Sequence, residues 1–92
     1  MVPPQGSKTK QGYQLQLGTN CIGHFLFTRM LHLILAETAK EAPADSVRVV
    51  WTSSNGAEFL SPKGGVDIDN LDYHVEKSAW EKYGVSKAGN IF

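Results

Sequence analysis

The chain has 92 residues, nine Lys or Arg balanced by nine Asp or Glu, and a hydrophobic content of 41%. These values describe one small globular domain at most, and a net charge of zero provides no basic field to gather the phosphates of a nucleic acid or an anionic membrane. The single cysteine, Cys21, excludes an internal disulfide and a thiolate metal site.

The first half of the chain is predicted to be an entry loop followed by one long helix. Residues 1–8 are rich in Pro, Gly, Ser and Lys without a periodic pattern, which indicates a loop. Thr9 is a candidate N-cap, and apolar residues at helical spacing predict a helix from near Lys10 to about Lys40. Its apolar surface is broad enough to favour burial on more than one face. Pro43 is expected to stop this helix.

The most apolar stretch of this helix, residues 21–36, is interrupted by His24, Arg29 and His32, which favours a buried helix over a membrane span. The two histidines lack a third ligand at a suitable spacing, so we expect no metal site and place them in the core or at an interface. Cys21 is expected to be a small packing residue. Without a disulfide framework or a signal peptide, the composition favours a reducing, cytoplasmic setting.

A strand and a second helix are predicted in the remainder of the chain. Residues 47–52 are β-branched and mostly apolar between polar pairs, which is typical of a buried strand in a parallel sheet. Residues 55–77 are expected to form a long irregular loop. Ser78 and Glu81 have the spacing of a capping box, so a helix is predicted over 79–92.

The predicted order of elements is helix, strand, loop, helix, which indicates the α/β class. A single buried strand needs neighbours on both sides, and the sequence offers none convincingly. The expected architecture is therefore a slice of a three-layer α/β fold with one central parallel strand.

Tyr83 and Lys87 lie four positions apart on the second predicted helix and so share one face. An ammonium close to a phenol favours the phenolate and lowers the pKa of a tyrosine toward neutral pH. Such a tyrosine can give a proton to a carbonyl oxygen or take one from an alcohol. The alternative is that both side chains merely decorate a helix surface, and the pair alone is a weak signal.

Ser53 and Ser54 follow the predicted strand at the position where ligands bind in open α/β sheets. A hydroxyl there can hydrogen-bond a substrate carbonyl, or it can serve an ordinary turn or cap. Asn20 lies inside the first predicted helix, although asparagine is a poor helix former. Its candidate roles are to hold a water, to bend the helix or to satisfy a local backbone carbonyl.

Four motifs in order resemble the short-chain dehydrogenase/reductase family over essentially the whole chain. Residues 7–14 and the run TNCIGHFL at 19–26 look like the family's central helix. RVVWTSS at 48–54 is similar to its catalytic-serine strand, and YGVSKAGNIF at 83–92 resembles its Tyr-x-x-x-Lys helix. The Gly-His-Phe and Ser-Lys-x-x-Asn-Ile-Phe details look most like the retinol-dehydrogenase-like branch.

The resemblance implies that Asn20, Ser54, Tyr83 and Lys87 form a catalytic tetrad. Tyr83 would be the general acid/base, and Ser54 would orient the carbonyl, with Ser53 as the alternative. Lys87 would lower the tyrosine pKa and hold the nicotinamide ribose, and Asn20 would anchor a water in the proton relay. Asn20, Tyr83 and Lys87 are thus also the expected cofactor-binding residues.

The activity implied is the NAD(P)-dependent interconversion of an alcohol and a carbonyl on a lipophilic substrate, with NADP favoured over NAD. The family's glycine-rich turn, which cradles the pyrophosphate, has no counterpart in the sequence. Residues 1–92 are therefore expected to be the central, incomplete portion of a single NAD(P)-binding domain, a partial Rossmann-type fold.

The alternative is a catalytically silent truncated product or a piece that interacts through its two helices. The resemblance makes a homo-oligomer the expected protein partner. No nucleic-acid partner and no membrane segment are expected.

Overall fold

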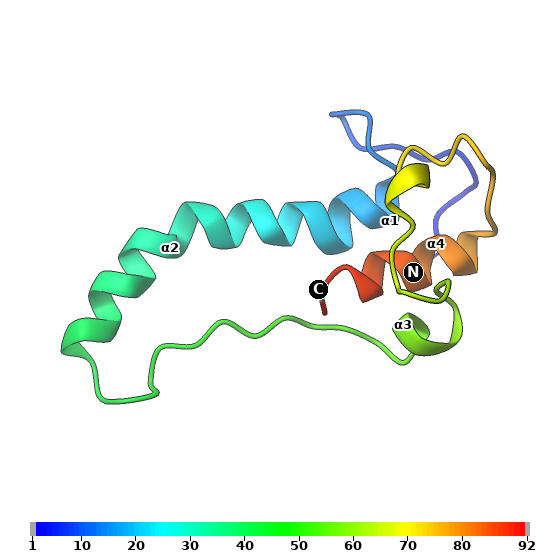
Figure 1. Ribbon diagram of the computed structural model, residues 1–92. Helices are drawn as coiled ribbons and strands as arrows, with labels where there is room; N and C mark the ends of the chain where they lie inside the picture. The colour runs from blue at the N-terminus through cyan, green and yellow to red at the C-terminus, as the bar shows by residue number, and fades with distance from the viewer. Residues whose placement is uncertain (1, 92) are drawn as a thin grey trace.

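The computed structural model describes residues 2–91, whose regular elements are all helical (Figure 1). In chain order they are α1 (Leu15–Leu17), the π-helix η1 (Gly18–Ile22), α2 (Gly23–Glu41), α3 (Gly56–Phe59), the 3-10 helix η2 (Ile68–Asn70) and α4 (Ala79–Ala88). The first three follow one another without a break and form one long continuous helix, which corresponds to the first predicted helix.

The long helix begins later than predicted because Thr9 closes a turn instead of capping a helix. The Thr9 amide donates to the Tyr13 carbonyl at 2.8 Å, and the Thr9 hydroxyl accepts the Tyr13 amide at 3.2 Å. Gly12, inside this turn, has a φ of +91°, which glycine adopts readily and other residues do not. The observed N-cap is Gln14, whose side-chain oxygen accepts a hydrogen bond from the Leu17 backbone amide at 2.9 Å. The prediction of Thr9 as the N-cap is wrong.

Asn20 lies in the π-helix η1, where the backbone hydrogen bonds reach one residue further than in an α-helix. The amide of Gly23 donates to the carbonyl of Gly18, five residues earlier. Such a turn distorts the helix locally and is frequent at functional sites. Distortion of the helix is one of the roles that the sequence suggested for Asn20.

α2 ends close to the predicted position. Ala42 is extended, with φ −80° and ψ 158°, because the ring of Pro43 disfavours the helical conformation in the residue before it. The prediction that Pro43 stops the helix is confirmed. No helix within residues 2–91 is long and apolar enough to cross a membrane.

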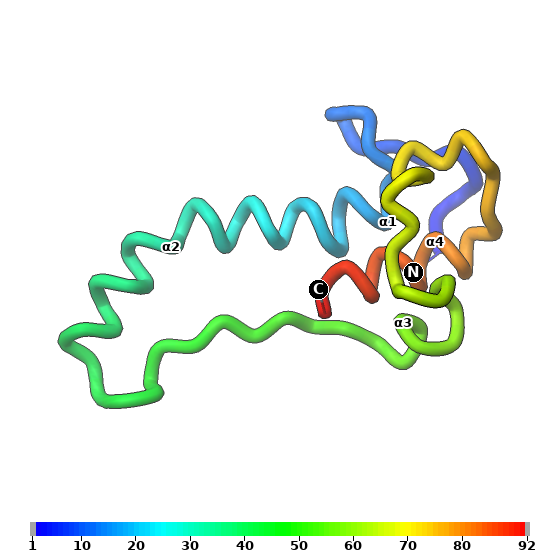
Figure 2. Tube along the Cα trace, viewed as in Figure 1, coloured from blue at the N-terminus to red at the C-terminus, as the bar shows by residue number. Residues whose placement is uncertain are grey.

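The predicted buried strand at residues 47–52 is not confirmed, because the structure forms no strand there. Residues 2–91 contain no strand, and their one isolated bridge pairs Lys8 with Gln14. The segment is extended and runs back along α2 (Figure 2), but Val50 is 82% exposed. A strand requires ladder bonds to a neighbouring strand, and the described residues supply no such neighbour. The sheet expected in the α/β fold is therefore absent from residues 2–91.

The core gathers around α4, where α1 and α3 pack against it. Its buried apolar residues are Leu17, Ala57, Tyr73, Val85 and Ala88. α2 contributes no buried residue, and its His24 and His32 are exposed, so of the two places expected for these histidines, a core or an interface, the core is wrong. The radius of gyration is 15.3 Å, against about 12 Å for a compact domain of this length. The chain is thus elongated, with its core at one end.

α4 begins as the sequence predicted. The Ser78 hydroxyl accepts the Glu81 amide at 3.2 Å, and the Glu81 carboxylate accepts the Ser78 amide at 3.0 Å, so the capping box is confirmed. The helix ends at Ala88 and not at Phe92, because residues 89–91 form a turn that begins with a glycine, a poor helix former. Phe92 lies outside the described residues.

Candidate functional site

Three of the four predicted site residues line one pocket between the start of the long helix and α4. They are Asn20, Tyr83 and Lys87, and the other walls are formed by Pro3, Leu15, Gln16 and Thr19. Tyr83 and Lys87 lie one turn apart on α4, so their side chains leave the same face of the helix. The pocket volume of about 330 Å³ lies at the lower end of the range of small-molecule sites, which is roughly 300–1,000 Å³.

Asn20 is fixed in the pocket wall by a hydrogen bond to α4. Its side-chain nitrogen donates to the Ser86 hydroxyl at 3.0 Å, and that hydroxyl donates to the Tyr83 carbonyl at 2.7 Å. Ser86 has no exposed surface, whereas Asn20 is partly exposed, so the bond is partly buried. The amide group of Asn20 therefore bonds to a distant helix and not to a local backbone carbonyl. The sequence analysis did not single out Ser86.

The two adjacent serines differ in their hydrogen bonds. The Ser53 hydroxyl donates to the Lys87 carbonyl at 2.9 Å, so its proton is committed to α4. The Ser54 hydroxyl accepts the Gly56 amide at 3.1 Å, a bond that does not use its own proton. Ser54 is not among the residues lining the pocket and lies on the turn into α3, two residues before Gly56, which contacts the Tyr83 ring. The structure thus unites three of the four residues and places Ser54 on an adjoining turn.

The extended segment is fastened to α4 close to Lys87. The Lys87 ammonium reaches the Thr52 carbonyl at 3.5 Å, and the Asn90 side-chain amide donates to the same carbonyl at 3.0 Å. With the Ser53 bond, these contacts bring the end of residues 47–52 to α4. The end of the predicted strand thus lies beside α4, although the described residues form no sheet.

Two residues not predicted from the sequence, Trp80 and Gly56, pack against the Tyr83 ring. Trp80, one turn earlier on α4, meets the ring edge to face, with centroids 6.3 Å apart and planes at 86°. Gly56 lies against the ring from α3. The signals in the sequence were an aromatic residue three positions before the tyrosine and a glycine two positions after the serine pair.

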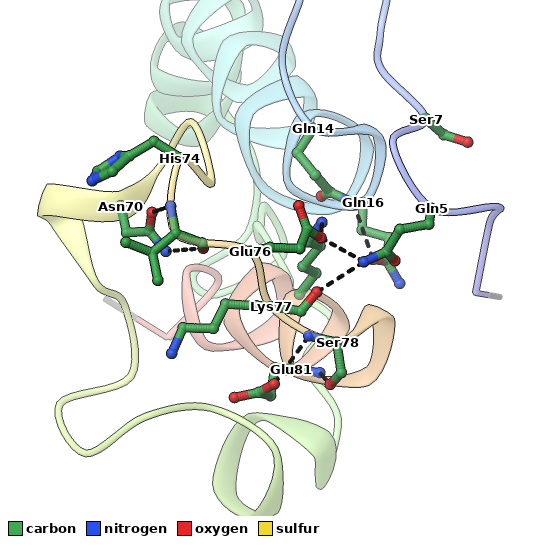
Figure 3. Close-up of polar contacts among 12 residues, drawn as sticks. Gln5, Ser7, Gln14, Gln16, Asn70, His74, Glu76, Lys77, Ser78 and Glu81 are labelled. Carbon is green, nitrogen blue, oxygen red and sulfur yellow. Dashed lines mark hydrogen bonds and ion pairs between the residues drawn. The ribbon is translucent and has the colours of Figure 1, made fainter.

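A polar cluster adjoins the site at Lys82, the residue before Tyr83. Lys82 is 4% exposed, pairs with the Glu76 carboxylate, and places its ammonium 5.0 Å from the centre of the Tyr73 ring. The same carboxylate accepts a hydrogen bond from the side-chain amide of Gln5. That amide also donates to the backbone carbonyl of Lys77 (Figure 3). The cluster ties the N-terminal segment, the loop before α4 and α4 together. No sequence pattern marked this lysine as buried.

Burial shifts the pKa values of two side chains that do not line the pocket, Tyr73 and Cys21. Burial, with the charge of Asp67 as a smaller cause, raises the pKa of Tyr73 to about 12, so Tyr73 is a neutral phenol at physiological pH. Burial also raises the pKa of the Cys21 thiol, which disfavours the nucleophilic thiolate. Within residues 2–91, no three His, Cys, Asp or Glu side chains are grouped to hold a metal ion.

The chain is similar along nearly its whole length to proteins named short-chain dehydrogenase/reductases. It is 56% identical over 91 residues to the short-chain dehydrogenase/reductase pkfC of Emericella nidulans, which is 99% of this chain and 29% of that protein. A short-chain dehydrogenase/reductase of Phomopsis amygdali is also 56% identical, over 99% of this chain and 27% of its own length. The uncharacterized oxidoreductase C736.13 of Schizosaccharomyces pombe is 37% identical, over 96% of this chain and 26% of its own length.

The chain therefore spans between a quarter and a third of the length of these relatives. No protein-family model matches the chain, and no solved structure matches it.

Proposed function

Because this chain belongs to the short-chain dehydrogenase/reductase family, we propose that its pocket carries the proton transfer of an NAD(P)-dependent oxidoreductase that interconverts an alcohol and a carbonyl. The observation that carries the proposal is that Asn20, Tyr83 and Lys87, from two distant parts of the sequence, line one pocket. The activity is proposed for the protein as a whole, in which residues 1–92 form one part of a single Rossmann-like domain.

Tyr83 is the proposed general acid/base. In the reducing direction its hydroxyl gives a proton to the carbonyl oxygen, and in the oxidising direction its phenolate takes the proton of the alcohol. Lys87 lies one helical turn away on the same face of α4, and its proposed role is to hold the nicotinamide ribose.

Ser54 is the proposed donor that orients the substrate carbonyl. Its hydroxyl accepts the Gly56 amide and retains a proton to donate, whereas the Ser53 proton is used by the Lys87 carbonyl. This difference supports Ser54 over Ser53. Asn20 has its side-chain nitrogen engaged by Ser86, so the proposed role of holding a water in the proton relay falls to its side-chain oxygen.

The pocket suits one end of a nicotinamide cofactor. Its volume of about 330 Å³ accommodates a group the size of nicotinamide ribose and not a whole dinucleotide. The Lys87 ammonium and the Tyr83 hydroxyl are donors suited to ribose hydroxyls, and with Asn20 they are the residues we propose to contact the cofactor. When bound, the nicotinamide supplies or accepts the hydride. The preference for NADP over NAD rests on the family resemblance alone.

Turnover of a carbonyl substrate with NADPH by the protein as a whole tests the proposal, and quenching of tryptophan fluorescence by NADPH in the purified 92-residue chain tests cofactor binding separately. We expect Tyr83→Phe to lower turnover by about 10²- to 10⁴-fold, because the general acid is removed. Tyr13→Phe is the matched control, since Tyr13 is 50% exposed and outside the pocket. Turnover that survives Tyr83→Phe would remove this residue from the mechanism.

A second candidate function, association through helices with another copy of the chain, is supported by α2. This helix has no buried residue, and Phe27, Met30 and Leu33 are 64%, 74% and 76% exposed. An apolar surface of this kind is typical of an interaction site. Sedimentation over a range of concentrations tests it: a dimer that Leu33→Lys dissociates supports association, and a monomer at all concentrations contradicts it.

A further inference from the structure

Gly56 lies so close to Tyr83 that a side chain at this position has no room. An ideal Cβ on Gly56 would be 2.9 Å from Cε1 and 3.2 Å from Cδ1 of the Tyr83 ring. Carbon atoms in favourable contact are about 3.5–4.0 Å apart. Gly56 is the first residue of α3 and is not among the glycines with positive φ. The backbone therefore does not require glycine here, and the Tyr83 ring does.

The Tyr83 ring is also confined by Trp80 and by the close approach of α3 to α4. Trp80 meets the ring edge to face at 6.3 Å between centroids, a favourable geometry for an aromatic pair. At the crossing, an ideal Cβ on Gly84 would be 2.6 Å from the Leu60 carbonyl carbon and 2.8 Å from the Gly56 carbonyl oxygen. The two helices thus approach with their backbones in contact, beside the Tyr83 ring.

We propose that Gly56 and Trp80 are positioning residues for Tyr83. They fix the plane of the ring while the residue lines the pocket that Asn20 and Lys87 share. Ser54 lies two residues before Gly56 on the same turn, so the contact also sets the separation between the Ser54 hydroxyl and the Tyr83 ring. The inference rests on the proposed function of Tyr83 as the general acid/base.

Nuclear Overhauser contacts in the full 92-residue chain test the arrangement without an activity assay. We expect contacts from the Tyr83 ring protons to the Gly56 α-protons and to the Trp80 indole, and absence of the Gly56 contact would overturn the proposal. Gly56→Ala should retain the helical circular dichroism, since alanine favours a helix, and should shift the Tyr83 ring resonances. Unchanged ring resonances in a folded Gly56→Ala variant would contradict it.

Trp80 supplies a second variant if Gly56→Ala does not fold. Trp80→Phe keeps an aromatic edge beside the Tyr83 ring, whereas Trp80→Ala removes it. We expect the Tyr83 ring resonances to stay near their wild-type positions in Trp80→Phe and to shift in Trp80→Ala. Equal shifts in the two variants would overturn the proposal.

The catalytic consequence is measured with the same substitutions in the protein as a whole. Gly56→Ala should lower kcat by about 10- to 100-fold, because a small displacement of a catalytic group is costly, and should leave KM for NADPH within about twofold. It should have no further effect in the Tyr83→Phe background, and an equal loss in both backgrounds would overturn the positioning role. If the wild-type protein as a whole shows no turnover, the proposed function fails by itself, and the Overhauser contacts still decide whether Gly56 and Trp80 hold the ring.

Discussion

Asn20 and Ser86, which are 66 positions apart in the sequence, are joined by a hydrogen bond of 3.0 Å between the π-helix η1 and α4. Ser86 lies between Tyr83 and Lys87 in the sequence and has no exposed surface. The bond therefore holds Asn20 against the turn of α4 that carries both residues. It is one direct contact between the two distant parts of the chain that form the pocket.

Ser86→Ala is expected to destabilise the fold by about 1–3 kcal/mol, because the Asn20 amide loses its buried acceptor. The free energy of unfolding from urea denaturation measures this cost. Ser46→Ala is the control, since Ser46 is exposed and its hydroxyl donates only to the nearby Pro43 carbonyl. That variant should stay within about 0.5 kcal/mol of the wild type. Equal losses of unfolding free energy in the two variants would show that the bond between Asn20 and Ser86 does not stabilise the fold.

Lys82→Met and Glu76→Gln should differ in their effect on stability. Glu76→Gln leaves the buried Lys82 ammonium without its carboxylate and should cost roughly 1–3 kcal/mol. Lys82→Met replaces the ammonium with an apolar group of similar length and should be much less costly, since burial of the charge is avoided. Urea denaturation of both variants checks the order. A larger loss in Lys82→Met would indicate that the ion pair itself stabilises the fold.

Stability should fall above pH 10 because of Tyr73. Its pKa is raised from 10.0 to about 12 in the folded chain. Below pH 10 both folded and unfolded chains keep the proton, and the contribution is fully present. Between about pH 10 and 12 the unfolded chain ionises first, so the free energy of unfolding should drop by roughly 2 kcal/mol.

Tyr73→Phe should remove most of this alkaline loss, as measured by urea denaturation on both sides of pH 10. An ultraviolet titration of the folded protein should also lose its highest tyrosine transition in this variant. Tyr13→Phe should change neither result, because Tyr13 is exposed. An alkaline loss of the same size in Tyr73→Phe would assign it to another group.

Ser78→Ala should weaken the start of α4. The Ser78 hydroxyl caps the helix, and its loss typically costs about 1 kcal/mol. Hydrogen bonds from Ser78 hold the pKa of Glu81 below its usual value. The stabilising effect of the Glu81 carboxylate is therefore present above the usual glutamate pKa and is lost as pH falls through the lowered one.

The pKa of Glu81, followed by NMR titration, should move only part of the way back toward 4.5 in the Ser78→Ala variant. The largest cause of the lowered pKa, the hydrogen bond from the Ser78 backbone amide, remains, and the smaller one, from the Ser78 side chain, is lost. Helical circular dichroism of α4 should decrease at the same time. A Glu81 pKa unchanged by the substitution would contradict the assigned cause.

The best sequence predictions concern features set by neighbours in the chain. The Ser78 and Glu81 capping box, the end of α2 before Pro43 and the shared face of Tyr83 and Lys87 all follow from residues within one helical turn. The cap assigned to Thr9 failed because a competing local turn with Tyr13 uses the same hydroxyl. The strand at residues 47–52 failed because its partners would have to come from elsewhere.

Local spacing in the sequence predicted that Tyr83 and Lys87 share one face of a helix and where that helix begins, because helix spacing and capping depend on residues close together in the chain. The folded arrangement was needed to show that Asn20 reaches α4 through Ser86, that Ser53 and Ser54 use their hydroxyls differently, and that Lys82 is buried. Hydrogen bonds and burial between segments depend on how the chain folds back on itself, and no local spacing encodes that distance.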